Sequence, residues 1–213
     1  MLGFVFPVFI SCNGEPRKPH QYNANPVFTV MGVGFFGQYY AHIPYYVFSF
    51  TFLSEGMLNE EGTAIVAPGQ FLFIEDFFVP KYRLDFLNDV PDDFVLTERK
   101  LFELLAGEYK VSGRVGSGNF GSAFSFAPGE LFTVDHATYI IGARITYHEP
   151  NPAFSARKLI TGGSFTVMPD RIKFNIITEN GFAINGVYLS PPGAFERKIE
   201  VKYEAETRER ERF

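Results

Sequence analysis

The sequence has a single cysteine and no tryptophan. Cys12 has no second thiol with which to form a disulfide within the chain, and metal sites built from several thiolates are excluded with it. No Gly-x-Ser-x-Gly motif is present, so the chain lacks the nucleophile elbow of an α/β-hydrolase. The absence of tryptophan also removes the indole ring that sugar-cleaving enzymes often use to hold their substrate. These absences leave few routes to catalysis.

Basic residues are too few and too scattered for a nucleic-acid site. The chain has 19 Lys and Arg against 24 Asp and Glu, which gives a formal net charge of −5. Proteins that bind nucleic acid gather Lys and Arg on one face to neutralise phosphates. We therefore expect no nucleic-acid partner.

Aromatic residues are abundant instead. The chain contains 26 Phe and 11 Tyr, many in short alternating runs, and 20 Gly and 14 Pro interrupt these runs. This composition is typical of short strands joined by turns. It predicts an all-β fold with little helix, either an antiparallel β-sandwich or a lipocalin-like barrel built from meanders. We expect a single domain over residues 27–205, with halves at about 27–106 and 107–205.

The clearest pattern covers residues 162–190. Apolar and polar residues alternate over 165–167 and over 172–176, which predicts two strands joined by a turn. Asn180-Gly181 then marks a hairpin, because both residues tolerate the positive φ that a type I′ turn requires. A third strand through 182–188 completes a three-stranded meander.

Further strands are expected where apolar runs end in turn residues. Residues 97–105 predict either a short helix capped by Thr97 or the approach to the next strand. The alternating Arg and Glu of residues 206–213 predict a frayed, solvated tail. The remaining predicted strands lie at 27–31, 45–53, 71–74, 107–112, 123–126, 139–147 and, as a closing strand, 199–203.

The N-terminal residues have the pattern of an export signal. Residues 1–11 form an uncharged apolar run that is too short to span a bilayer but fits the hydrophobic region of a signal peptide. Phe9-Ile10-Ser11-Cys12 resembles a lipobox, the tetrapeptide at which bacterial lipoprotein precursors are lipidated on the cysteine sulfur and cleaved. We expect Cys12 to carry the lipid and residues 12–26 to form a tether. The alternative is a buried N-terminal strand with a chance cysteine.

Three motifs of the second half suggest a family. Ala106-Gly107-Glu108-Tyr109, residues 159–167 and Gly186-Val187-Tyr188 follow one another in the order of a strand opening, a long strand and a hairpin end. Together with the flanking strands they resemble the β-rich secreted lipoproteins of Bacteroidota, in which Thr stands where this chain has Glu108 and Val187. The likeness covers roughly residues 40–190. It implies a β-sandwich or barrel outside the cytoplasm, lipid-anchored to the outer membrane, with no catalytic residues to carry over.

Candidate metal ligands are confined to an acidic segment at residues 75–93. Carboxylate oxygens are the hard ligands that calcium prefers, although the spacing is not that of an EF-hand. A solvated acidic loop is the alternative interpretation, and no other cofactor is expected. The residues concerned are Asp76, Asp85, Asp89, Asp92 and Asp93.

Two other motifs carry less chemistry. Gly116–Gly121 matches Gly-x-Gly-x-x-Gly, but the residues after it predict a strand and not the helix that a dinucleotide site needs, so a hairpin loop is favoured. The histidines are dispersed in the sequence without metal-ligand spacing, so a zinc site is not predicted. They are His20, His42, His136 and His148.

Tyrosines near residue 40 are the best candidates for ligand contact. A tyrosine combines an apolar ring with a polar tip, which suits sugars and partner surfaces. The alternative is that they belong to the sheet core and the ordinary surface. The residues are Tyr39, Tyr40, Tyr45 and Tyr46.

These observations favour a non-enzymatic binding or structural protein of the cell envelope. Its expected ligand is a glycan, a partner protein, or a small apolar molecule inside a closed barrel. The alternative is a glycan-active hydrolase that uses two carboxylates of the 75–93 segment as acid and base or nucleophile. A third hypothesis is a strand-donating or filament component that docks through its C-terminal tail.

Overall fold

The computed structural model describes residues 22–37, 45–84, 96–112, 123–148 and 156–193. Within these ranges the chain is almost entirely β-structure, with one α-helix and one short 3-10 helix. The elements are β1 Val27–Gly37, β2 Tyr45–Ser54, β3 Gly69–Pro80, η1 Lys81–Arg83, α1 Glu98–Leu105, β4 Gly107–Val111, β5 Ser125–Phe126, β6 Glu130–Val134, β7 Ala137–Ile141, β8 Arg144–His148, β9 Ala156–Met168, β10 Arg171–Thr178, β11 Ala183–Ile184 and β12 Val187–Leu189.

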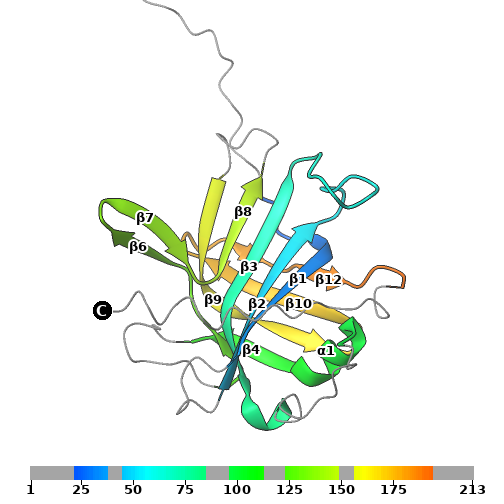
Figure 1. The fold of residues 1–213 in the computed structure, drawn as a ribbon. Coiled ribbons are helices and arrows are strands. Elements are labelled where there is room, and N and C mark those ends of the chain that lie inside the picture. The colour runs from blue at the N-terminus through cyan, green and yellow to red at the C-terminus, as the bar shows by residue number, and fades with distance from the viewer. Residues whose placement is uncertain (1–21, 38–44, 85–95, 113–122, 149–155, 194–213) are drawn as a thin grey trace, which may run out of the picture.

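The strands of the main sheet pair into a closed ring. Going round it, β1 pairs with β2, β2 with β3, β3 with β8, β8 with β9, β9 with β10, β10 with β12, and β12 with β1. Figure 1 shows the sheet curling round on itself. The all-β prediction is confirmed. The sheet is mixed and not purely antiparallel, because β1 pairs in parallel with β12 and β4 in parallel with β5.

The long strand β3 divides its length between two neighbours. Residues 69–73 pair with β8, whereas Phe77 and Phe78 pair with β5, which continues through β4 to β9. Asp76 lies between the two stretches with φ of 50°, a left-handed conformation that Asp tolerates better than most residues. The strand therefore changes partner at Asp76, next to the place where the β6–β7 hairpin leaves the ring.

Aromatic side chains fill the inside of the ring. In β10, Ile172, Phe174 and Ile176 are buried while the residues between them are exposed, so the period-two pattern selects the inner face. Buried rings from different strands then meet, with centroids 4.6 Å apart for Phe50 and Phe77. Buried rings of the described strands thus pack against one another inside the ring. The fully buried aromatic residues include Phe28, Phe48, Phe50, Phe52, Phe77, Phe102, Tyr109, Phe126, Phe165 and Tyr188.

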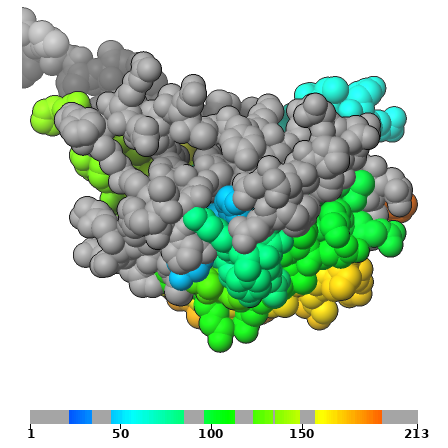
Figure 2. Space-filling model, turned by 60° about the horizontal axis from the view of Figure 1, so that its bottom comes forward, coloured from blue at the N-terminus to red at the C-terminus, as the bar shows by residue number. Residues whose placement is uncertain are grey.

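The helix closes one end of the ring. Residues 97–105 adopt the helical alternative, with the Thr97 hydroxyl accepting a hydrogen bond from the Lys100 amide at 3.2 Å. Leu101, Phe102 and Leu105 are buried in the same cluster as the ring interior. In Figure 2 the green surface of α1 and β4 lies beside the yellow surface of β9. Among the described residues there is no helix of the length and apolar character needed to cross a membrane.

The predicted meander at 162–190 is confirmed in outline. β9 and β10 join through a tight turn, and β10 returns to β11 through residues 179–181. The prediction of a type I′ turn at Asn180-Gly181 was wrong, because Gly181 is the only residue of this loop with a positive φ, 73°. Thr178 N donates to Phe182 O at 3.0 Å and closes a three-residue loop, as in a type I turn followed by a bulge. The third strand divides into β11 and β12 at residues 185–186.

The single strand predicted at 139–147 was also wrong. Gly142 has φ of 72°, and a Cβ there would lie 2.0 Å from the Pro128 carbonyl oxygen, so the chain turns at a close backbone contact. The segment becomes two strands, β7 and β8. β7 pairs with β6 through a two-residue turn at Asp135-His136, where φ is 47° and 67°. A type I′ turn therefore does occur, but without glycine.

Residues 22–26, which the sequence assigns to the tether, pack against the ring. The Tyr22 ring lies 6.0 Å from the Tyr147 ring, and Lys158 Nζ lies 5.2 Å above the Tyr22 ring. Burial raises the pKa of the Tyr22 hydroxyl above its ordinary value. The Asn23 amide donates to Gln70 Oε1 at 2.5 Å. The first described residues are therefore part of the packed fold.

Several predicted features lie outside the described residues and stay predictions. They are the apolar run 1–11 with Cys12, His20, Tyr39, Tyr40, His42, Asp85, Asp89, Asp92, Asp93, the motif at 116–121, the closing strand at 199–203 and the tail at 206–213.

Candidate functional site

A groove lies on the outer face of the ring, between β3, β8 and the β6–β7 hairpin. The hairpin stands away from the sheet in Figure 1, beside β8 and β9. The hollow has a volume of about 540 Å³. It is lined by Phe71, Phe73, Thr138, Tyr139, Ile140, Arg144, Thr146, His148 and Arg157. We call this hollow the outer groove.

The pleat of two adjacent strands builds the floor of the outer groove. In β3, Leu72 and Ile74 are buried inside the ring, so Phe71 and Phe73 face outward and are only half-buried. In β8, Ile145 is buried, so its neighbours on either side face outward as well. The register places Phe71 opposite Thr146 and Phe73 opposite Arg144. Residues of two strands far apart in sequence thus form one surface.

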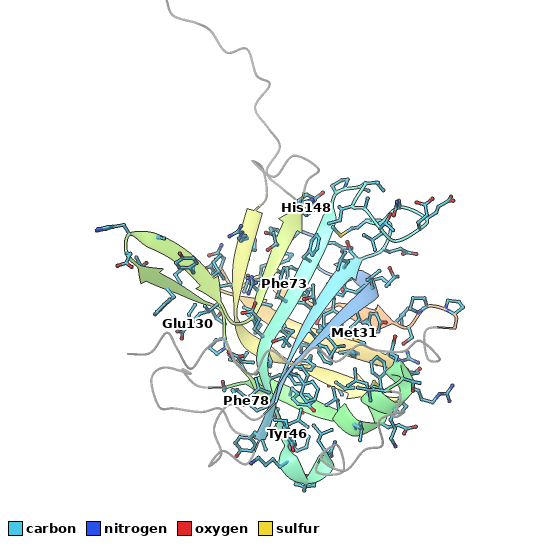
Figure 3. The ribbon with its side chains drawn as sticks, viewed as in Figure 1. Met31, Tyr46, Phe73, Phe78, Glu130 and His148 are labelled. Atoms are coloured by element: carbon cyan, nitrogen blue, oxygen red, sulfur yellow. The ribbon has the colours of Figure 1, made fainter. Side chains whose placement is uncertain are left out.

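Aromatic rings form a row along this floor. The rings of Phe71 and Phe73 lie 5.9 Å apart and only 7° from parallel. The His148 ring meets Phe71 edge-on at 5.5 Å, and the Arg144 guanidinium lies 4.4 Å above the Phe73 ring centroid. Figure 3 labels Phe73 and His148, which lie on the neighbouring strands β3 and β8. The floor therefore carries two parallel phenylalanine rings with a cationic group at one end.

An ion pair fixes the Arg144 end of the row. Arg144 Nη1 donates to Glu75 Oε1 at 2.7 Å and to the Gly142 carbonyl at 3.0 Å, and the Gly142 amide donates to Glu75 Oε2 at 3.1 Å. The two side chains are only 18% and 31% exposed, so solvent screens this pair less than an open surface pair. Glu75 is therefore engaged by the base of the hairpin and holds it against β3.

Among the described residues that line the outer groove, the charged groups are cationic. Arg144 and Arg157 contribute guanidinium groups, and none of these described lining residues is an Asp or Glu. Arg157 lies on β9 opposite Thr146 and is exposed. Its guanidinium has no hydrogen bond or ion pair to another described residue. A locally positive surface thus lies on a chain whose net charge is −5.

A second hollow lies where the chain enters the fold. It has a volume of about 400 Å³ and is mainly polar. Gln70, which is 3% exposed, closes it by accepting from the Asn23 amide and by donating to the Asn23 carbonyl at 3.3 Å. The backbone N–H of Gln70 also donates a hydrogen bond to Ser54 Oγ at 2.9 Å. These bonds join the N-terminal segment to β2 and β3, so we interpret this hollow as a structural seam.

The predicted tyrosines that fall in the described part do not line the outer groove. Tyr46 is 6% exposed and belongs to the core cluster. Tyr45 is half-buried, and its ring lies 6.3 Å from Phe78. Both come from the start of β2, which pairs with the end of β3. The core interpretation therefore applies to Tyr46.

The described part of the predicted acidic segment shows no assembled metal site. Asp76 lies within β3, and its backbone carbonyl accepts a hydrogen bond from the backbone amide of Ala127 at 3.1 Å. His136 is in the β6–β7 turn, and His148 ends β8. Within the described ranges no group of three or more His, Cys, Asp or Glu side chains is arranged to hold a metal ion.

Of the groove residues, the sequence pointed only to His148, and as a possible metal ligand. Phe71 and Phe73 belong to an apolar run, Phe71 to Ile74, in which the pattern does not reveal which face is inside. The spacing of Arg144, Thr146 and His148 at every second position was the available signal. It indicated a polar outer face on a strand whose inner face is apolar.

Comparisons with protein-family models, with curated proteins and with solved structures gave no match for this chain.

Proposed function

We propose that this chain is a non-catalytic binding domain of the cell envelope that holds its ligand in the outer groove. One observation carries the proposal: half-buried aromatic rings and cationic side chains from three strands converge on one hollow of about 540 Å³. Ligand sites are typically concave, largely apolar surfaces with a few fixed polar groups. The aromatic row of Phe71 and Phe73 supplies the apolar surface, and Arg144 supplies a cation that Glu75 holds in place.

The proposal favours binding over hydrolysis because of the state of Glu75. A glycoside hydrolase needs two carboxylates on either side of the bond that it cleaves. Glu75 accepts hydrogen bonds from Arg144 and Gly142 through its two oxygens, so it serves the hairpin base and not a substrate. The described residues that line the outer groove include no carboxylate.

The envelope location rests on the sequence around Cys12. The lipobox-like Phe9-Ile10-Ser11-Cys12 supports a lipid on the Cys12 sulfur and attachment to the outer membrane. The chain joins the fold at Tyr22, which packs against Tyr147 of β8. Ten residue steps separate Cys12 from Tyr22 and span at most about 35 Å of extended chain. A lipid on Cys12 therefore keeps the domain close to the membrane surface.

Lipidation is tested by metabolic labelling with a palmitate analogue in a bacterial host, followed by membrane fractionation. Wild type is compared with Cys12→Ser. Labelling and membrane association that disappear in the variant support the anchor. An unlabelled wild-type chain with an intact N-terminus by mass would overturn it.

Binding is tested with the Cys12→Ser chain on an array of envelope glycans and small molecules. Phe71→Ala removes a ring from the outer groove, and Ile177→Ala removes an apolar side chain of 41% exposure from the outer face of β10 as the matched control. We expect Phe71→Ala to weaken binding of any array ligand at least several-fold and Ile177→Ala to leave it unchanged. Array binding that both variants reduce equally, or no binding at all, would overturn the groove as the site.

A further inference from the structure

We infer that the ligand of the outer groove is an acidic glycan, whose sugar rings lie on Phe71 and Phe73 and whose acidic groups pair with Arg157 and Arg144. The inference rests on the proposed binding function and names its ligand class. The charges, the ring geometry and the strand pairing of the groove floor support this ligand class.

The charges of the outer groove select an anion. Its lining, as far as the structure describes the chain, has two guanidinium groups and no carboxylate, whereas the whole chain has a net charge of −5. The Arg144 guanidinium donates hydrogen bonds to Glu75 and Gly142. The Arg157 guanidinium is exposed and makes no hydrogen bond or ion pair to a described residue. A guanidinium presents five N–H donors in a planar fork that matches carboxylate and sulfate oxygens. Arg157 is therefore the principal contact for the acidic group.

The ring geometry favours a sugar over a purely apolar molecule. The Phe71 and Phe73 rings are parallel to within 7°, with centroids 5.9 Å apart, and both side chains are only half-buried on the outer face. The face of an aromatic ring carries partial negative charge, which attracts the C–H groups on one side of a sugar ring. Thr138 and Thr146 line the same hollow, and a threonine hydroxyl can both donate and accept hydrogen bonds, as sugar hydroxyls require; the Thr138 hydroxyl also lies 3.3 Å from that of Thr133.

The strand pairing of the groove floor disfavours the addition of an extended peptide there. Peptides that add to a sheet need a strand edge with unpaired backbone N–H and C=O groups. Over the groove floor, β3 is paired on one side with β2 and on the other with β8, and β8 is also paired with β9. The floor therefore offers side chains and not backbone groups to its ligand.

A polynucleotide does not fit the charge distribution. Tracking a phosphate backbone needs a series of basic residues over many ångströms. The outer groove supplies two arginines, and the chain as a whole is acidic. An oligosaccharide with an acidic group on some of its sugars matches this sparse charge better.

The test uses matched acidic and neutral oligosaccharides with the full Cys12→Ser chain. One pair is an oligogalacturonate and its methyl ester, and the other is a sulfated oligosaccharide and its desulfated form. Binding is measured by titration calorimetry at low and high salt. We expect the acidic member of at least one pair to bind about tenfold or more tightly than its neutral counterpart, with affinity falling as salt rises.

Three variants locate the contacts. Arg157→Gln removes the exposed guanidinium and should weaken binding of the acidic oligosaccharide about tenfold, without changing the neutral one. Phe73→Leu keeps an apolar side chain but removes the ring, and should weaken both members of a pair. Lys173→Gln removes an exposed cation from the outer face of β10 and should leave both affinities unchanged.

Each outcome decides the inference. Equal affinity for acidic and neutral members, or for Arg157→Gln and Lys173→Gln, would overturn the acidic ligand while leaving groove binding intact. An oligoglutamate peptide that binds as tightly as the oligosaccharides, with no effect of Phe73→Leu, would overturn the glycan class. If no oligosaccharide binds and the array of the preceding section is also silent, the binding function itself fails.

Discussion

Two neighbouring glycines of β9 are predicted to respond in opposite ways to the same substitution. Gly163 has φ of 92°, and a Cβ there would lie 2.1 Å from the Asn175 carbonyl oxygen and 2.7 Å from the Ile176 Cα. Both atoms belong to the backbone of β10, which pairs with β9 at this position. No side-chain rotation relieves the contact, so Gly163→Ala forces the two strands apart.

The magnitude follows from three contributions. A left-handed conformation costs an L-residue about 1–2 kcal/mol. Displacing β9 from β10 weakens ladder hydrogen bonds that contribute about 1 kcal/mol each. The smaller conformational entropy of alanine in the unfolded chain offsets about 0.4–1 kcal/mol. We expect Gly163→Ala to lower the free energy of unfolding by about 3 kcal/mol, a large share of the roughly 5–15 kcal/mol of a typical domain.

Gly162→Ala is the matched control. A Cβ at Gly162 would lie 3.4 Å from Ile177 Cβ, which is ordinary van der Waals contact, and its φ is not in the left-handed region. The entropy contribution then acts alone, so we expect unchanged stability or a gain of about 0.5 kcal/mol.

The assay is urea denaturation of the three chains. Because the chain has no tryptophan, unfolding is followed by far-ultraviolet circular dichroism and tyrosine fluorescence. We expect the urea midpoint of Gly163→Ala to fall by about 1 M or more with an unchanged slope. A Gly163→Ala chain within about 1 kcal/mol of wild type, or a Gly162→Ala chain destabilised as strongly, would refute the assigned backbone of this strand.

Three further predictions concern the core. Burial raises the pKa of the Tyr109 hydroxyl above its ordinary value near 10, so this group ionises first in the unfolded chain and the free energy of unfolding falls as pH rises above 10. In Tyr109→Phe the free energy of unfolding should fall less steeply with pH than in wild type. Equal slopes of the two chains would contradict this prediction. Tyr188→Phe removes a 2.8 Å hydrogen bond to the buried carboxylate of Glu98 and should lower the free energy of unfolding, measured by urea titration, by about 1.5–3 kcal/mol. As the control, Tyr139→Phe changes an exposed ring and should alter the free energy of unfolding by less than about 0.5 kcal/mol. Phe165→Ala should cost about 3–5 kcal/mol, because the ring is fully buried among other rings, and a loss under about 1 kcal/mol would contradict the packing.

Local patterns in the sequence predicted much of the fold. Alternation in β10 identified the buried face, because polar residues occupy every second position. Thr97 was identified as the cap of one of two alternatives for residues 97–105, a helix or the approach to a strand, and the structure has the helix with the Thr97 hydroxyl as its cap. Such features depend on residues a few positions apart, so a single sequence contains them.

Features that depend on distant pairing could not be predicted. Nothing in the sequence indicates that β3 pairs with β8, so the stacking of Arg144 over Phe73 could not be predicted. The Asp135-His136 turn lacks the glycine by which such turns are normally recognised. Tyr46 could not be assigned to the core or the surface, because the run at the start of β2 is apolar on both faces.

The parallel pair of β1 and β12 has a consequence for the order of folding. It joins Val27 to Val187 and Phe28 to Tyr188, so the ring closes only when residues from both ends of the described chain are present together. Until β12 has been synthesised, β1 has no partner on that side. Sheets that depend on such distant contacts fold slowly, in about milliseconds to seconds. Closure of the ring therefore requires β12, and we expect a chain cut before Val187 to keep an open strand edge on β1 that favours aggregation.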